Sequence, residues 1–503
     1  MDRRAFLALL SATAACRQPE PFSIEEVSIS ELGEALRAGR VTARGLVEAY
    51  LTRIRIIDRS GPHLNSILEI NPDALSIADA LDAELRDKGP RGPLHGIPIL
   101  IKDNIDTADR MQTTAGSVAL LDAPTPQRDA AIVTRLRESG AVLLGKTNLS
   151  EWANIRSTRS TSGWSGRGGL TRNPYALDRN TSGSSSGSAA AAAASLCAAA
   201  IGTETDGSIV SPSSVCGLVG IKPTVGLLGG DGIIPISHSQ DTAGPMARSV
   251  RDAALLLGAL AKTPQDFTAA LDPNALRGAR LGVARRYMGR NQHVTTVANQ
   301  CLEALEKAGA VLVDPVDLSS IDFSGERNTL LYELKADMAA YLEQRGGPLF
   351  SLEELIAFNK HHAATELRWF GQEYFELSVK TGGLQEKEYL EARAKVEKAR
   401  KDLTALMDRE RLDALIATTN SPAWLSDLVN GDNSGQGCSG PAAVTGFPHI
   451  TVPGGLAEGL PIGFSFFGRA HDESRLIQLA HAFEQATKAR RPPLYRPRSG
   501  PGA

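Results

Sequence analysis

The chain has 503 residues, of which 42% are hydrophobic and 5% aromatic, and its formal net charge is −3. A chain of this length can bury a large core. Its nearly balanced charge argues against a nucleic acid or an anionic membrane recruited by charge alone. The five cysteines include no C-x-x-C pair, which gives no sign of a disulfide framework.

Residues 1–20 are predicted to form an export signal. Arg3 and Arg4 precede a short apolar stretch, as in twin-arginine signals, and this stretch is too short to span a bilayer as a helix. The small residues before Cys16 resemble a lipoprotein cleavage site with Cys16 as the lipid-bearing residue; cleavage nearby without a lipid is the alternative. We therefore expect export, with the mature protein in the periplasm or anchored by lipid on the outer side of the inner membrane.

The first half of the chain alternates predicted helices and strands. The expected elements are, in chain order, a helix over 32–36, a helix from Thr42, a strand over 66–70, a helix from Pro72, a strand over 96–101, a helix over 130–136 and a strand over 141–145. The run at 96–101 is continuously apolar, typical of a strand buried on both faces, and Lys102 stands at its end. This alternation indicates an α/β domain.

The middle of the chain is rich in small and polar residues. Residues 150–188 are rich in Ser, Thr, Gly, Arg and Asn, and a polar stretch of this length inside a compact domain is usually functional. Six alanines at 189–194 predict a helix, because alanine has the highest helix propensity. The second half is expected to be mostly helical from 253 to 411. Its expected elements are helices over 328–343, 352–367, 387–409 and 474–486 and strands over 412–418, 448–453 and 461–466.

No internal repeat or linker is evident, so we expect one domain over 22–490, followed by a disordered tail at 491–503. The tail expectation rests on its richness in Pro and Arg.

Two Ser/Gly-rich turns are the strongest candidates for chemistry, at 182–188 and 202–208. A flexible surface loop is the plain alternative, but a helix former follows the first turn at once. Residues 183–187 also fit G-x-S-x-G, the nucleophile elbow of α/β-hydrolases, but that motif needs a strand before it, and 172–180 is not strand-like. No lysine has a serine three residues before it, which excludes an S-x-x-K motif. A serine nucleophile with a distant lysine base is left as the best interpretation.

These turns and their surroundings resemble the amidase signature family. The family pattern Gly-Gly-Ser-Ser-Gly-Gly-Ser matches 182–188 imperfectly, and Gly-Thr-Asp-Thr-Gly-Gly-Ser matches 202–208. Flanking blocks also match, at 96–104, 143–148, 217–224 and 241–248, and the similarity runs from about residue 28 to 488. The resemblance implies a single large α/β domain with a central mixed β-sheet flanked by helices.

The resemblance also implies the roles of three side chains. Lys102 is the base, Ser184 is a bridging serine after a cis peptide bond, and Ser208 is the nucleophile that forms an acyl-enzyme. The chemistry is consistent, because burial at the end of an apolar strand disfavours the ammonium form of Lys102. Ser184 can then pass a proton between Ser208 and Lys102. No metal or organic cofactor is expected.

An oxyanion needs donors aimed at it, and the resemblance assigns this role to the backbone N–H groups of Thr205, Asp206, Gly207 and Ser208. The sequence departs from the family pattern at Ser182, Ser186, Glu204 and Asp206. The carboxylate of Asp206 would oppose an oxyanion unless only its backbone faces the site.

The form of residues 203–208, with that of 148–154, resembles the peptide-amidase branch, which removes ammonia from C-terminal amides of peptides. The expected substrate is therefore a peptide amide or an amino-acid amide. Asn154, Ser185 and Trp424 are the candidate substrate contacts.

Alternatives stay open at several points. Lys146 and Lys222 are alternative bases for which ion pairs or solvation at strand ends are expected, and ordinary hydrogen bonding is expected for His238. His361 and His362 are adjacent on a predicted helix, so their side chains point apart and do not favour a metal site. Two rival functions are the glutamine-hydrolysing component of a tRNA amidotransferase and a catalytically inactive binding protein.

Overall fold

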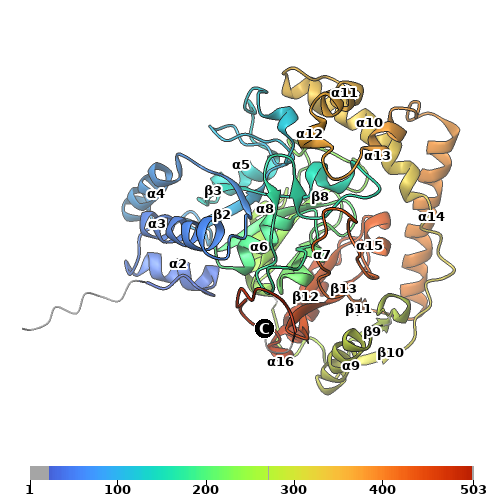
Figure 1. The fold of residues 1–503 in the computed structure, drawn as a ribbon. Coiled ribbons are helices and arrows are strands. Elements are labelled where there is room, and N and C mark those ends of the chain that lie inside the picture. The colour runs from blue at the N-terminus through green and yellow to red at the C-terminus, as the bar shows by residue number, and fades with distance from the viewer. Residues whose placement is uncertain (1–21, 270, 290, 501–503) are drawn as a thin grey trace, which may run out of the picture.

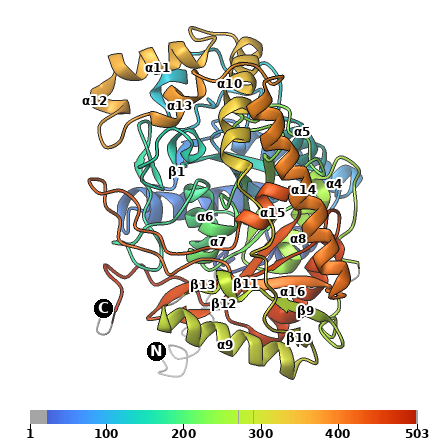
Figure 2. The ribbon, with the colours of Figure 1, turned by 90° about the vertical axis from the view of Figure 1, so that its right-hand side faces the viewer.

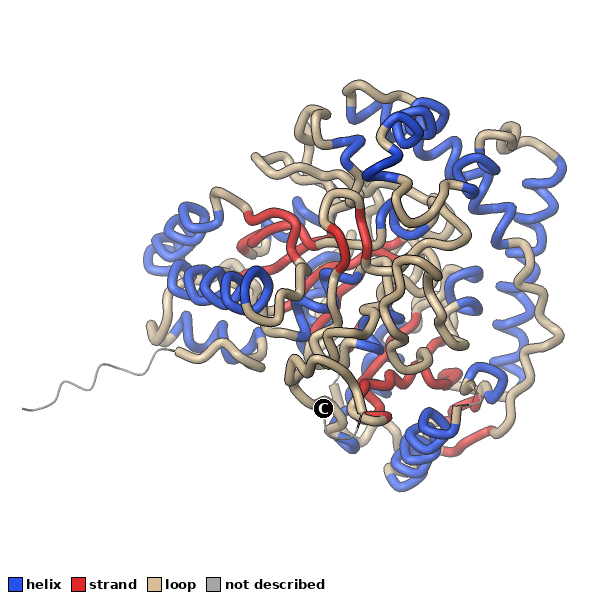
Figure 3. Tube along the Cα trace, viewed as in Figure 1, coloured by secondary structure: helices blue, strands red, loops and turns tan. Residues whose placement is uncertain are grey.

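A mixed sheet of eleven strands runs through the molecule, with helices on its flanks (Figures 1 and 3). The strand order is β1-β3-β2-β6-β8-β7-β12-β13-β11-β9-β10. The strands are β1 (Ile67–Ile70), β2 (Pro98–Lys102), β3 (Val142–Thr147), β6 (Ala199–Glu204), β7 (Val219–Lys222), β8 (Thr242–Ala247), β9 (Arg280–Val283), β10 (Val311–Val313), β11 (Ala414–Thr418), β12 (His449–Ala457) and β13 (Leu460–Phe467). β2 is parallel to both β3 and β6, and the pairs from β6 to β11 are antiparallel. The predicted single α/β domain with a central mixed sheet is confirmed.

This computed structural model describes residues 22–269, 271–289 and 291–500. The predicted export signal at 1–20, including Cys16, lies outside the described residues. Among the helices that are described, none has the length and apolar character needed to cross a membrane.

Helices of the first half and of the C-terminus pack near the sheet. They are α2 (Ile29–Arg37), α3 (Ala43–Arg53), α4 (Ala74–Lys88), α5 (Ala131–Glu138), α6 (Ser186–Ala193), α7 (Val210–Val215), α8 (Val250–Leu260), α9 (Gln292–Lys307), α15 (Gly440–Thr445) and α16 (Glu473–Thr487). α6 packs on β2, β3, β6 and β8, and α7 packs on β7, β12 and β13. The side chains of α6 are small enough for this close approach: a Cβ at Gly187 would lie 2.2 Å from the carbonyl oxygen of Ser66.

A second group of helices stands at one end of the molecule and along one side (Figure 2). It comprises α10 (Glu326–Arg345), α11 (Leu352–His361), α12 (Ala363–Glu366), α13 (Glu373–Ser378) and α14 (Lys387–Arg409). α10 contacts α11, α13 and α14. A separate hydrophobic cluster joins Leu334, Met338 and Tyr341 of α10 to Leu149 and Trp152. These contacts fix α10 beside the segment that leads into the Ser/Gly-rich region.

Some predicted elements differ from the structure. The region 253–411, expected to be mostly helical, contains the strands β9 and β10, which are only four and three residues long and so too short to show a periodic pattern. The helix expected over 352–367 is divided at His362 between α11 and α12. The small residues after the alanine run do not prolong a helix, because Ala199 begins β6.

The expected disordered tail is also corrected in part. The backbone N–H of Tyr495 donates to Pro174, and that of Leu177 donates to Arg496. The Tyr495 hydroxyl accepts from the Arg53 guanidinium at 3.3 Å. Residues around 495 therefore pack on the domain, because their backbone polar groups find partners there.

Candidate active site

The ends of two neighbouring parallel strands bring the predicted base to a polar cluster. Lys102 is the last residue of β2, and Thr203 lies on β6 beside it. The fully buried Lys102 Nζ lies 2.7 Å from the Ser184 Oγ, 2.8 Å from the Thr203 Oγ1 and 3.3 Å from the Thr203 carbonyl oxygen. Asn104 Nδ2 donates to the same threonine hydroxyl at 3.0 Å. The lysine amine is therefore held in one place by short polar contacts.

Burial sets the protonation of this amine. Removal from water lowers the pKa of Lys102 from 10.5 to about 7, and the negative charges of Asp241 and Glu204 oppose that shift. The amine is thus a free base in a large fraction of molecules near neutral pH, as a proton acceptor must be.

The two candidate serines belong to segments that are joined by a backbone hydrogen bond. The peptide bond between Gly183 and Ser184 is cis, as the family resemblance implies, and Ser184 is fully buried. The N–H of Ser185 donates to the carbonyl oxygen of Ser208 at 3.2 Å. Gly183 is required here because a Cβ would lie 2.0 Å from the Ser150 Oγ.

Ser208 lies in the turn between β6 and α7. The Glu204 carboxylate accepts from the N–H groups of Ile209 at 2.7 Å and Val210 at 3.0 Å, which fixes the backbone immediately after Ser208. Gly207 has a φ of +78°, a conformation that favours glycine. In residues 22–269, 271–289 and 291–500 the Ser208 hydroxyl makes no hydrogen bond, and the residue is 8% exposed. It is therefore an unengaged hydroxyl at the edge of a buried site.

The predicted oxyanion donors are also unengaged. No hydrogen bond from the backbone N–H groups of Thr205, Asp206, Gly207 or Ser208 is found within the described part of the chain. Four successive N–H groups without a partner form a concave group of donors of the kind that binds anions.

The Asp206 side chain is exposed to a pocket and faces a second carboxyl group. Burial raises the pKa of Asp206, whereas the Ser439 hydroxyl, the Lys222 charge and the Glu326 side chain lower it. Burial, followed by the charge of Asp206, raises the pKa of Glu326 to about 8. This pair therefore holds one proton at neutral pH, because two carboxylates at close range do not both ionise readily. The predicted conflict between Asp206 and an oxyanion is reduced by the shared proton.

A pocket of about 250 Å³ opens beside the two serine segments. It is lined by Asn154, Ser162, Ser182, Gly183, Asp206, Gly207, Val210, Ser211, Thr419, Asn420, Trp424, Asp432, Ser434, Gly435, Gly437 and Ser439. None of these residues is basic. A neighbouring cavity of about 510 Å³ shares Asn420, Trp424 and Gly435 with it, so the two form one elongated cleft.

The three predicted substrate contacts have different surroundings. Asn154 lines the pocket, and its Oδ1 atom is buried without a hydrogen-bond partner among the described residues. Trp424 also lines the pocket, and its indole N–H donates to Asp432 at 3.0 Å. The Ser185 hydroxyl instead bonds the backbone of Thr203, donating to its oxygen at 3.1 Å and accepting from its N–H at 3.2 Å. The prediction that Ser185 contacts substrate is therefore not supported, because its hydroxyl is already used to hold β6.

The alternative bases are bound elsewhere. Lys146 Nζ donates to the Thr113 hydroxyl at 2.8 Å and Lys222 Nζ to the Phe447 carbonyl at 2.6 Å. Within the described residues neither amine is bonded to a serine hydroxyl. Sequence reasoning missed Thr203, Glu326 and Ser439, which lie far apart in the chain. Only Thr203 stood within a recognised motif, so the other two gave no local signal.

Residues 45–477 match the model of the family described as Amidase. The chain is 38% identical to a probable amidase of Arabidopsis thaliana, over 98% of this chain and 96% of the relative. The chain therefore belongs to the amidase signature family, and it is an amide hydrolase.

Two further relatives bear on its activity. The crystal structure of native peptide amidase from Stenotrophomonas maltophilia is 47% identical, with a TM-score of 0.89, covering 94% of this chain and all of that one. The A-type component of the glutamyl-tRNA(Gln) amidotransferase of Halorhodospira halophila is 33% identical over 92% of this chain and 98% of the relative. The predicted likeness to peptide amidases is confirmed.

Proposed function

We propose that this amide hydrolase releases ammonia from the C-terminal amides of peptides or from amino-acid amides, using Ser208, Ser184 and Lys102. The observation that carries the proposal is the 2.7 Å contact between the Lys102 amine and the Ser184 hydroxyl. Beside it lie a serine hydroxyl and four N–H groups that are unpaired among the described residues. The likeness to a peptide amidase supports the choice of substrate.

The reaction proceeds in two halves. The Ser208 Oγ attacks the carboxamide carbon while its proton passes through the Ser184 hydroxyl to the Lys102 amine. The negative charge on the carbonyl oxygen is stabilised by the N–H groups of residues 205–208. The proton then returns to the amide nitrogen, the C–N bond breaks, and ammonia leaves an ester on Ser208. A water molecule attacks this ester by the same proton path, which releases the carboxylic acid and restores the serine.

The pocket lining is consistent with a neutral substrate. Asp206 and Asp432 contribute carboxyl groups and no lining residue is basic. A carboxylate product meets repulsion there that a carboxamide does not, which favours product release.

The test is ammonia release from a panel of N-acetylated peptide amides, single amino-acid amides and other linear amides, with Ser208→Ala as the matched control. We expect turnover of the first two groups, labelling of Ser208 by a serine-reactive phosphonate, and loss of both in the control. Hydrolysis of other amides without any turnover of peptide or amino-acid amides would contradict the substrate assignment. Normal activity of Ser208→Ala would contradict the mechanism.

The glutamine-hydrolysing component of a tRNA amidotransferase is the second candidate, favoured by the 33% identity to the relative from Halorhodospira halophila. Co-purification with other components of such a complex and glutamine-dependent ammonia release would support it. The remaining rival, an inactive binding protein, conflicts with the family membership and the intact lysine–serine contact. Export stays a prediction from residues 1–20, and cell fractionation with a Cys16→Ser variant tests both the location and the lipid.

A further inference from the structure

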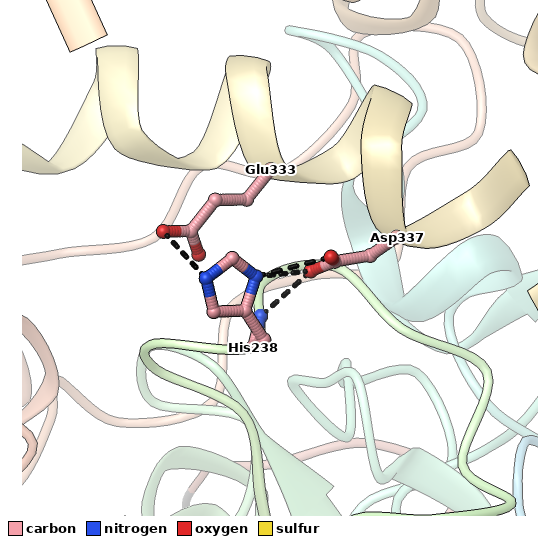
Figure 4. A group of neighbouring side chains, drawn as sticks. All are labelled: His238, Glu333 and Asp337. Atoms are coloured by element: carbon pink, nitrogen blue, oxygen red, sulfur yellow. Dashed lines mark hydrogen bonds and ion pairs between the residues drawn. The ribbon is translucent and has the colours of Figure 1, made fainter. Parts of the chain in front are cut away.

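His238 stands between two carboxylates of α10 (Figure 4). Its Nδ1 lies 3.0 Å from both carboxylate oxygens of Asp337, and its own backbone N–H donates to Asp337 at 2.8 Å. On the other side, the Nε2 lies 3.5 Å from the Glu333 Oε1. Each ring nitrogen therefore faces its own acceptor.

The group fits an imidazolium better than a metal ion. Glu333 is fully buried, and it accepts from the Ser237 hydroxyl, from the Ser239 N–H at 3.2 Å and from the Tyr389 hydroxyl at 2.8 Å. A ligand nitrogen offers a lone pair to a metal, and only one nitrogen of a ring can do so in one direction. Here the ring separates the two carboxylates, with N···O distances suited to N–H donors. The protonated ring thus supplies the positive charge between them.

The same loop reaches the segment that carries the candidate oxyanion donors. Asp241 accepts from the N–H groups of Ile236 at 2.7 Å and Ser237 at 2.9 Å, and its other oxygen accepts from the Thr205 hydroxyl at 2.6 Å. Next to it, the Gln240 amide lies 3.4 Å from the Thr205 carbonyl and donates to Glu326 of α10 at 3.1 Å. The loop from 236 to 241 is therefore fixed to α10 at one side and to Thr205 at the other.

We propose that His238 is a positioning residue, whose contact with Glu333 and Asp337 holds the 236–241 loop so that Asp241 fixes Thr205 and the N–H groups of residues 205–208 aim at the reacting carbonyl. This inference rests on the proposed function of those N–H groups. The His238 side chain is 53% exposed, so its replacement leaves the core intact. It lies outside the proton path from Ser208 to Lys102. Arg393, which donates to the Ser239 hydroxyl at 2.9 Å, is a further cation on this loop.

The experiment compares His238→Gln, His238→Arg and a control on the same helix. Lys335→Met removes contacts of α10 with the carbonyls of Val379 and Thr381 at 3.1 and 2.7 Å, which do not involve the 236–241 loop. For a neutral peptide amide we expect His238→Gln to lower kcat about tenfold with KM within about twofold, because the donors act mainly in the transition state. His238→Arg restores kcat to within about threefold, since it returns a planar cation. The control keeps the kcat of the unaltered protein.

A second measurement does not depend on activity. Backbone hydrogen exchange of a peptide covering residues 203–209 is faster in His238→Gln than in the unaltered protein and in Lys335→Met. Unchanged exchange and unchanged kcat in His238→Gln would overturn the inference, as would one tightly bound metal ion per chain that His238→Gln loses. An inactive Ser208→Ala together with these exchange results supports both proposals. Full activity of Ser208→Ala overturns the proposed function while the exchange result still tests the loop.

Discussion

The protonation of Lys102 predicts the acid side of the activity profile. The perturbation is a change of pH for a neutral, N-acetylated peptide amide, so that only the enzyme titrates. An ordinary lysine with a pKa of 10.5 is a free amine in about one molecule in 3,000 at pH 7, whereas a pKa of about 7 gives about one half. Activity that needs the free amine is therefore half-maximal near pH 7 and about 1% of maximal at pH 5.

The assay is the initial rate of ammonia release, from which kcat/KM is plotted against pH. The expected plot falls about tenfold per pH unit on the acid side of pH 7. Asp241→Asn removes a negative charge that raises the pKa of Lys102, so its profile shifts toward lower pH by up to about one unit. A rate that is flat from about pH 8 to about pH 5, or a midpoint near that of an ordinary lysine, would refute the assignment of Lys102 as the base.

The same site gives three further predictions. Lys102→Met abolishes activity yet raises the melting temperature, because burial of this amine costs about 5 kcal/mol below pH 7 and the lost hydrogen bonds offset only part of it; calorimetry should show the gain shrinking as the pH rises toward 10.5, and a lower melting temperature would contradict it. Glu204→Gln lowers kcat about tenfold with little change in KM, because one of the two N–H contacts that fix the backbone after Ser208 is weakened; steady-state kinetics at pH 8 measure it, and an unchanged kcat would exclude the positioning role. The unaltered protein loses activity above about pH 8 as the Asp206–Glu326 pair releases its proton and places a second negative charge beside the oxyanion donors; Glu326→Gln should remove this decline, and a decline that persists would point to another group.

The chemistry of the site was more predictable than its supporting structure. The apolar run before Lys102 indicated a buried strand, and its burial is also what lowers the lysine pKa, so one local pattern predicted both. The helix over 387–409 was predicted with the bounds of α14, because its amphipathic pattern is long. By contrast, the contacts of Glu326 with Asp206 and of His238 with Asp337 join residues about 100 or more positions apart. Nothing in the local sequence indicates which distant side chains the fold brings together.

The hydroxyl of Ser185 shows the limit of motif reasoning. It stands within a recognised Ser/Gly turn, yet it bonds the backbone of Thr203 and lies away from the pocket. A motif shows which residues belong together, but the direction of each side chain depends on the backbone around it.

The construction of the pocket bears on how such an enzyme can change its preferences. The reacting groups lie on β2, β6 and the closely packed start of α6, where an added methyl group at Gly183 or Gly187 meets other atoms at once. Half of the pocket lining comes instead from the stretch 419–439, which has no helix or strand of its own. Natural variation or directed evolution can therefore reshape the entrance through that irregular stretch, and leave the catalytic machinery untouched.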